Sequence, residues 1–178
     1  SMRYIDKLIT EGPARGAPRH EVEYQLDILR FLGAQPQDPR LEVWTSSEDE
    51  RFAQDIIAGH GLKTDGLLVA LAPGARWAFR RWPEGRFQEL GRWLQEDYGA
   101  RILIMAEKSE RDLARRIASG LQEKGTLNLA GQTTLREMAA VLKRCRLFVG
   151  NDSGPLHMAA ACGVPALGLF GTGEYERF

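Results

Sequence analysis

From residue 41 onward, short apolar segments alternate along the sequence with longer segments whose apolar residues recur at helical spacing. Residues 67–72 are an almost continuous apolar run, which is typical of a strand buried on both faces. Strands separated by single helices predict a parallel sheet with right-handed crossovers, and therefore a Rossmann-like, doubly wound α/β fold. The expected strands are residues 41–44, 67–72, 101–105, 127–129, 147–149 and 166–169, and the expected helices are residues 47–59, 83–98, 109–121, 134–144 and 154–162.

The first 40 residues differ from the rest in composition. Glycines and prolines are frequent there, and they flank a single amphipathic stretch, residues 22–32, which ends at Gly33. We therefore expect residues 1–40 to be an interdomain linker with one amphipathic helix. Residues 41–178 are expected to form the α/β domain.

Charge and cysteine content exclude several classes of partner. Lys plus Arg equals Asp plus Glu at 24 each, so no global field favours nucleic acid as a partner. No apolar run approaches the roughly 20 residues of a membrane span, and the N-terminus lacks the pattern of a signal peptide. Cys145 and Cys162 lack the spacing of a metal site and are too few for a disulfide framework, so we expect a cytoplasmic protein without zinc.

The commonest strand order of such a sheet is 3-2-1-4-5, counted from residues 67–72. Ligands of these folds bind beyond the carboxyl ends of the strands, at the switch point between strands one and four. The two loops that reach this point are residues 73–82 and residues 150–154. Both are therefore candidates for a ligand site.

The second loop has the residues of a phosphate site. Asp152 comes at the strand end, and Ser153 and Gly154 form a turn into a helix that begins with Pro155. Free N–H groups at a helix start can bind phosphate, and Gly154 lets a ligand approach the backbone closely. His157 follows one turn later. In the alternative interpretation Asp152 or Ser153 only caps the helix and His157 packs in the core, but the position at the switch point favours ligand binding.

Basic and acidic residues follow the first and second buried strands. Arg80 and Arg81 can make bidentate phosphate contacts, and we expect one of the two to be only a solvated surface charge. Trp82 is expected to pack in the core. Glu107 could accept hydrogen bonds from ribose hydroxyls, or it could be an ordinary surface charge. Neither Gly-x-Gly-x-x-Gly after the first buried strand nor a P-loop is present, which argues against dinucleotide oxidoreductases and P-loop enzymes.

A series of motifs follows the same order as in a known family. They are Ala72-Pro73-Gly74-Ala75, Arg80-Arg81-Trp82-Pro83, residues 128–135 (NLAGQTTL), residues 150–161 (GNDSGPLHMAAA), Gly163-Val164-Pro165 and Leu169-Phe170-Gly171. In order and spacing they resemble glycosyltransferase family nine, which contains the ADP-heptose:lipopolysaccharide heptosyltransferases. The resemblance covers roughly residues 20–175.

The resemblance implies a GT-B architecture, in which this chain is the C-terminal, nucleotide-sugar-binding domain with its preceding linker. It implies that Arg80 stands where many members have a diphosphate-binding lysine and that Glu107 stands where the ribose binds. Asp152, Ser153, Gly154 and His157 then match the donor-site motif. Thr172-Gly173-Glu174-Tyr175 departs from the Pro-Thr-Asp-Pro that follows the final Phe-Gly in many members.

The implied reaction moves a sugar, heptose from ADP-heptose, to a lipid-linked or oligosaccharide acceptor of lipopolysaccharide type, with inversion and without a metal or other cofactor. The family's general base, an aspartate of the N-terminal domain, has no counterpart here, so we expect no catalytic residue in these 178 positions and no activity of this fragment alone. Peripheral contact with the cytoplasmic face of the inner membrane also follows from such an acceptor. The alternatives are a non-catalytic nucleotide or phospho-ligand module and half of a sugar-nucleotide epimerase.

Overall fold

The computed structural model describes residues 20–36, 38, 40–62 and 66–171. Leu41–Gly173 forms one compact unit, and α2 (Glu21–Phe31) belongs to another. This helix is the amphipathic helix predicted for residues 22–32. Its first turn is capped by His20, whose Nδ1 accepts a hydrogen bond from the Val22 N–H at 3.2 Å. None of the residues of α2 is buried.

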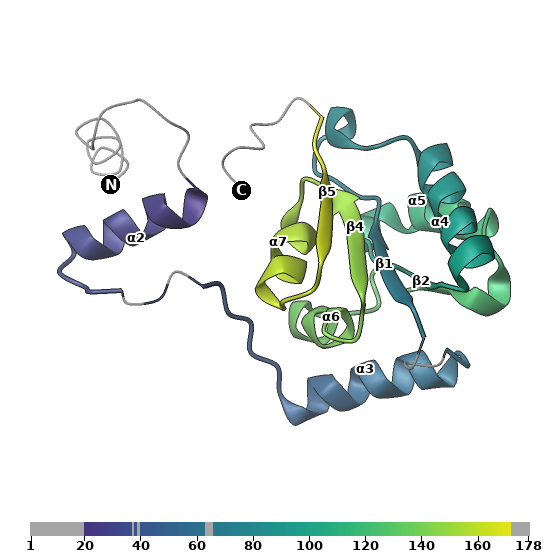
Figure 1. Cartoon of the computed structure of the whole chain (residues 1–178), viewed down its shortest axis with the longest axis horizontal. Coiled ribbons are helices and arrows are strands. Elements are labelled where there is room, and N and C mark those ends of the chain that lie inside the picture. The colour runs from purple at the N-terminus through teal and green to yellow at the C-terminus, as the bar shows by residue number, and fades with distance from the viewer. Residues whose placement is uncertain (1–19, 37, 39, 63–65, 172–178) are drawn as a thin grey trace. The chain divides into compact units, whose positions relative to one another are not determined.

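The larger unit is built on a parallel sheet of five strands in the order β3-β2-β1-β4-β5 (Figure 1). The strands are β1 (Leu68–Ala72), β2 (Arg101–Ile104), β3 (Thr126–Asn128), β4 (Leu147–Asn151) and β5 (Ala166–Leu169). Each strand is parallel to its neighbours. The predicted fold class and strand order are confirmed.

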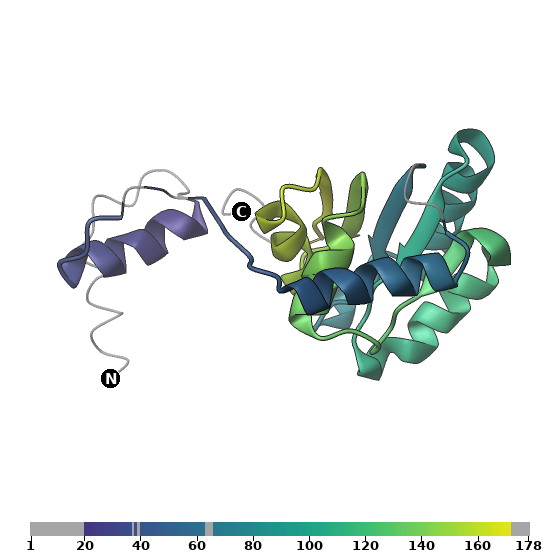
Figure 2. The same cartoon turned by 90° about the horizontal axis from the view of Figure 1, so that it is seen from below.

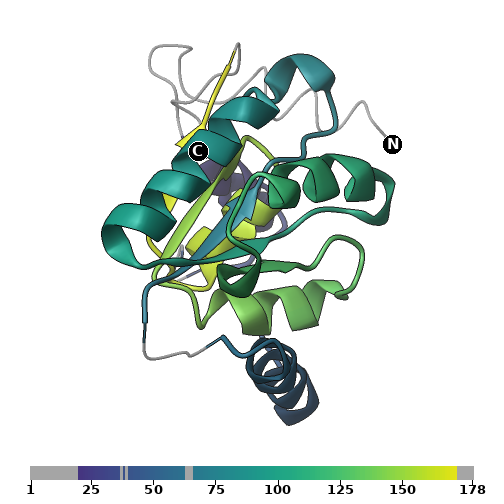
Figure 3. The same cartoon turned by 90° about the vertical axis from the view of Figure 1, so that its right-hand side faces the viewer.

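Helices cover both faces of the sheet (Figure 3). They are α3 (Ser47–Gly59), α4 (Glu84–Tyr98), α5 (Arg111–Ser119), α6 (Leu135–Leu142) and α7 (Gly154–Ala161), with short 3-10 helices η1 (Ala78–Arg80), η2 (Lys108–Glu110) and η3 (Glu123–Gly125). Buried residues of α4 and α5 share one core cluster, whereas those of α3, α6 and α7 share the other. Among the described residues, no helix is long and apolar enough to cross a membrane.

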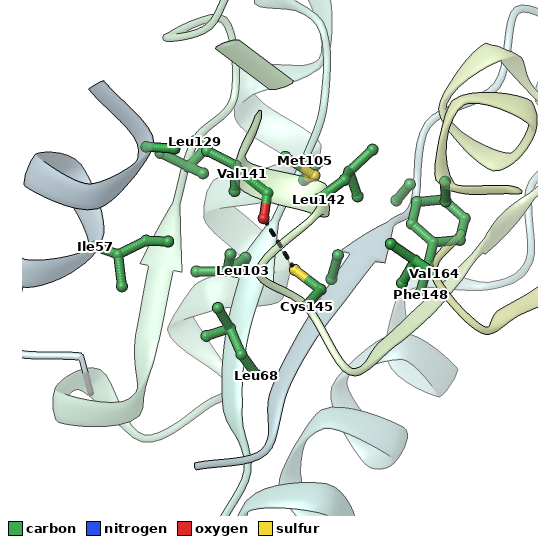
Figure 4. Close-up of a cluster of buried hydrophobic side chains, with 14 of the residues drawn as sticks. Ile57, Leu68, Leu103, Met105, Leu129, Val141, Leu142, Cys145, Phe148 and Val164 are labelled. Carbon is green, nitrogen blue, oxygen red and sulfur yellow. Dashed lines mark hydrogen bonds between the residues drawn. The ribbon is translucent and has the colours of Figure 1, made fainter. Parts of the chain in front are cut away.

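Strand β1 lies between these two cores, and all five of its residues are buried. Leu68, Ala70 and Ala72 face the core beneath α3 and α6, and Val69 and Leu71 face the opposite one. The near-continuous apolar run of β1 is therefore explained by burial on both faces. Figure 4 shows the α3/α6 side, where the Cys145 thiol approaches the carbonyl of Val141 at 3.6 Å.

Helix α3 lies alongside α6 (Figure 2), and ion pairs join its first turn to the end of α6. Glu50 Oε2 is 2.5 Å from Arg144 Nη1, and its Oε1 accepts a hydrogen bond from the Thr45 hydroxyl at 2.6 Å. The Thr45 hydrogen bond, followed by the one from Arg144, lowers the pKa of Glu50 below its ordinary value. The folded chain therefore favours the ionised form of this carboxylate.

One predicted strand was wrong. Residues 41–44 form no strand but lead irregularly into Ser46, the N-cap of α3. Leu41 and Trp44 are 47% and 77% exposed, so this apolar run contributes little to the core. A strand needs a neighbouring backbone to satisfy its N–H and C=O groups, and local sequence does not reveal whether that neighbour exists.

Candidate functional site

The two predicted loops, residues 73–82 and 150–154, meet at the carboxyl edge of the sheet. The reason is the strand order: β1 and β4 are neighbours, with Ala72 opposite Gly150 at their ends. From β1 the chain continues to β2 and β3 on one side, and β4 and β5 lie on the other. The loops therefore lie at the switch point, where doubly wound folds bind their ligands.

Asn151, at the end of β4, joins the two loops by a bridge that the sequence analysis missed. Its side chain is completely buried. The amide Nδ2 donates to the Pro73 carbonyl at 2.8 Å, and Oδ1 accepts from the Trp82 N–H at 2.9 Å. Asn151 thus holds both ends of the first loop against β4. A polar amide at the end of an apolar strand was the available signal, because a buried amide must find hydrogen-bond partners.

Arg81 fastens the same loop to the residues that follow β2. Its Nε donates to the Ala75 carbonyl at 3.0 Å, and its Nη2 is 3.0 Å from Glu110 Oε1. The Glu110 carboxylate also lies directly against Gly74, where a Cβ would collide with it. Any larger residue at position 74 would displace the Glu110 carboxylate from this place beside Arg81. Arg81 was predicted to bind diphosphate, but the structure gives its guanidinium two partners within the protein, and Glu110 was not foreseen.

Arg80 and Asp152, both predicted as site residues, are brought together from opposite loops. Arg80 Nη1 lies 2.9 Å from Asp152 Oδ2. The Asp152 side chain is only 9% exposed and that of Arg80 is 38% exposed. Arg80 Nε is buried and has no hydrogen-bond partner within the described part of the chain. Asp152 therefore orients a guanidinium that keeps unused donors at the switch point.

The start of α7 lies beside this pair. Its N-cap residue Ser153 is extended, and the Ser153 hydroxyl donates to the Asn151 carbonyl at 3.1 Å instead of capping the helix. An added Cβ at Gly154 would meet nothing within 4 Å, so the space in front of this backbone is open. The alternative interpretation, in which Ser153 caps the helix, is wrong for this side chain. A helix start without a side-chain cap is a favourable environment for an anion.

The remaining two predicted residues, His157 and Glu107, belong to different elements at this edge of the sheet. His157 is half-buried in the first turn of α7. Glu107 is exposed after β2, where its backbone N–H donates to Glu110 Oε2 at 3.2 Å and its carbonyl accepts from the Glu110 N–H at 3.0 Å. No interaction identified among the described residues joins Glu107 to Arg80 or Asp152. The same residues contain no group of three His, Cys, Asp or Glu side chains that could hold a metal ion.

Known proteins of one family resemble this chain over most of its length. The profile of "Glycosyltransferase family 9 (heptosyltransferase)" matches residues 16–178. Lipopolysaccharide heptosyltransferase 3 of Escherichia coli is 35% identical in an alignment of 163 positions that covers 88% of this chain and 45% of that protein. Lipopolysaccharide heptosyltransferase 1 of Pseudomonas aeruginosa is 36% identical in an alignment of 199 positions, gaps included, that covers 98% of this chain and 54% of that protein. The chain spans about half the length of these relatives.

Solved structures give the same result for the fold. A family 9 glycosyltransferase from Veillonella parvula superposes with a TM-score of 0.79 at 24% identity, over 88% of this chain and 45% of the other. The E. coli ADP-heptose lipopolysaccharide heptosyltransferase II superposes with a TM-score of 0.67 at 25% identity, over 80% of this chain and 44% of the other. The observed sheet and its covering helices therefore have the Rossmann-like form found in GT-B heptosyltransferases.

Proposed function

The chain belongs to glycosyltransferase family 9, and from this membership we propose that it is the domain that binds the sugar donor of a lipopolysaccharide heptosyltransferase. The donor is a nucleoside diphosphate sugar, ADP-heptose, and the domain is the C-terminal half of a GT-B enzyme. Residues 1–40 are the linker that precedes it. The lipopolysaccharide heptosyltransferases among its relatives support a transferase over an epimerase of the same architecture.

One observation carries the proposal: the Arg80–Asp152 pair lies beside the start of α7 at the switch point. A diphosphate placed there would receive hydrogen bonds from the exposed part of the Arg80 guanidinium. The N–H groups at Ser153 and Gly154 would add the positive end of the helix dipole. His157 and Glu107 would contact the remainder of the donor.

The same arrangement suits the departure of the diphosphate. Negative charge builds on the leaving group as the glycosidic bond breaks, and preorganised donors stabilise such charge most effectively. Arg80 and the α7 N–H groups supply this stabilisation without a metal or another cofactor. Transfer with inversion also requires a general base that deprotonates the acceptor hydroxyl. We assign that base to a part of the enzyme outside these residues.

The acceptor is, in this proposal, a lipid-linked or oligosaccharide core of lipopolysaccharide type that the rest of the enzyme positions. The protein would act in the cytoplasm, at the cytoplasmic face of the inner membrane, because its acceptor is lipid-linked. The chain by itself is expected to bind the donor and not to transfer the sugar, since acceptor positioning and proton transfer each contribute large factors to the rate.

Isothermal titration calorimetry of this chain with ADP tests the donor site. Half of a two-domain cleft buries less of a ligand than the whole, so we expect a binding free energy of about 4–6 kcal/mol, in the millimolar to high micromolar range. Titrations with UDP and CMP show whether adenine is preferred. Absence of heat and of NMR shifts with every nucleotide would contradict the proposal.

A coupled assay for ADP release tests the division of labour. The full-length protein with ADP-heptose and a lipopolysaccharide core acceptor should release ADP in an acceptor-dependent manner, and this chain should not. If the chain alone releases ADP at a rate near that of the full-length enzyme, the catalytic residues lie within it, and Asp152 and His157 become the first candidates.

A further inference from the structure

The strand order also sets the direction in which a bound donor would lie along the carboxyl edge of the sheet. If the proposed function holds, on which this inference rests, Glu107 at the end of β2 contacts the ribose, and Arg80 holds the diphosphate between β1 and β4. The carboxyl ends follow one another as β2, β1, β4 and β5. An extended nucleotide sugar that passes over β2 and β1 in this direction places its sugar ring near the end of β5.

Two exposed aromatic rings belong to the loop that reaches this place. Trp77 and Phe79 precede Arg80, are 52% and 65% exposed, and stack with ring centroids 6.2 Å apart and an angle of 19° between their planes. The carbonyl of Phe79 lies beside Gly171, just after β5, where an added Cβ would be 3.5 Å away. In Figure 1 the short helix η1, which contains Phe79, lies next to the end of β5.

The geometry of this aromatic pair suits contact with one face of a ligand ring. The rings are nearly parallel, and the Arg76 guanidinium lies 5.6 Å from the centroid of the Trp77 ring. Aromatic side chains offer a large rigid surface at a low cost in conformational entropy, and the C–H face of a sugar ring can cover such a surface. The exposed pair Trp93 and Tyr98 on α4 differs, because its rings meet edge to face at 75°.

We propose that Trp77 and Phe79 form a stacking platform for the sugar ring of the nucleotide-sugar donor. The platform acts on the sugar and not on the nucleotide, so it sets the preference of the site for a sugar nucleotide over the free nucleoside diphosphate. Arg80, three residues after Trp77, serves both ligands because both carry the diphosphate.

The test compares two ligands on matched variants of this chain. The ligands are ADP and ADP-2-deoxy-2-fluoro-heptose, and the variants are Trp77→Ala, Trp77→Phe and the control Trp93→Ala. Trp77→Ala should weaken binding of the sugar nucleotide about five- to tenfold and leave ADP binding within about twofold. Trp77→Phe keeps a flat ring and should restore most of the loss. Trp93→Ala should change neither affinity, and circular dichroism checks that each variant is folded.

The outcomes separate this inference from the proposed function. If the unchanged chain binds neither ligand, the donor site itself is wrong. If it binds both, but Trp77→Ala leaves their affinity ratio unchanged, the platform is refuted while the donor site stands. An equal loss for both ligands would also refute the platform, because the ring would then only shape the loop that carries Arg80.

Discussion

Replacing Asn151 by alanine should both destabilise the domain and weaken its ligand site. The side chain makes two short hydrogen bonds to backbone groups, at 2.8 Å to the Pro73 carbonyl and at 2.9 Å to the Trp82 N–H. Without them, a buried acceptor and a partly buried donor lose their partner. Each such group costs about 1–3 kcal/mol, and water entering the vacated space offsets part of the loss. We expect Asn151→Ala to lower the free energy of unfolding by about 2–4 kcal/mol.

Urea unfolding followed by tryptophan fluorescence and circular dichroism measures this change. With a denaturant slope of roughly 2 kcal/mol per molar urea, the midpoint should fall by about 1–2 M. The slope itself should stay constant, because the surface exposed on unfolding does not change. At concentrations of urea well below the transition, the variant should also bind ADP about tenfold more weakly, since the loop that carries Arg80 has lost its attachment to β4.

Gln95→Ala is the matched control. Gln95 is also a buried amide: its Oε1 accepts from the Gln122 N–H at 3.0 Å, and its Nε2 donates to the hydroxyl of Thr126, the first residue of β3, at 3.1 Å. Its loss should destabilise the domain by a similar amount and leave ADP affinity within about twofold. The reasoning fails if Asn151→Ala costs less than about 0.5 kcal/mol, or if both variants lose ADP affinity equally.

Three further predictions concern charges and thiols. Arg80→Ala should cost about 1.5–3 kcal/mol of ADP binding, and Arg81→Ala clearly less, as measured by calorimetry; equal losses would mean that the pair is wrongly assigned. Cys162 should react with iodoacetamide long before Cys145, because burial raises the pKa of the Cys145 thiol to about 12. Mass spectrometry of the labelled protein shows the order of labelling, and faster labelling of Cys145 would contradict the prediction. The pKa of Glu50 is lowered on folding, so its stabilising effect is present at neutral pH and is lost as the pH falls below about 4.5. Glu50→Gln should therefore lower the free energy of unfolding by about 0.5–1 kcal/mol at pH 7 and flatten the decline of the urea midpoint between pH 6 and pH 3. An unchanged decline would contradict this prediction.

Sequence patterns predicted the sheet because the responsible signals are local. The apolar run of β1 indicated burial on both faces, and the helix predicted for residues 134–144 does begin at a local signal, the capping box of Thr134 and Glu137. Single helices between strands restrict the topology to few choices. The same rules placed the two ligand loops at one edge, and the structure brings Arg80 to Asp152 there.

The contacts within the site could not be predicted in the same way. Asn151 bonds a residue 69 positions earlier, and Arg81 pairs with Glu110, 29 positions later. Such pairs depend on the three-dimensional course of the chain and leave no periodic pattern in the sequence. For residues 41–44 the prediction failed in the opposite way: their composition is typical of a strand, but no neighbouring strand pairs with them. Burial and hydrogen-bond partners, not residue type, decide these cases.

The most direct measurement of the central claim is a two-dimensional 1H–15N NMR spectrum of the labelled chain during titration with ADP. The largest shifts should appear at the amides of Ser153 and Gly154 and at the side-chain Nε–H of Arg80, with the same apparent dissociation constant. Shifts that are absent at saturating ADP would contradict a donor site on this domain. The claim would equally be contradicted by shifts confined to the hollow lined by Arg111, Arg115, Asn128, Ala130 and Gln132, with Ser153, Gly154 and Arg80 unshifted.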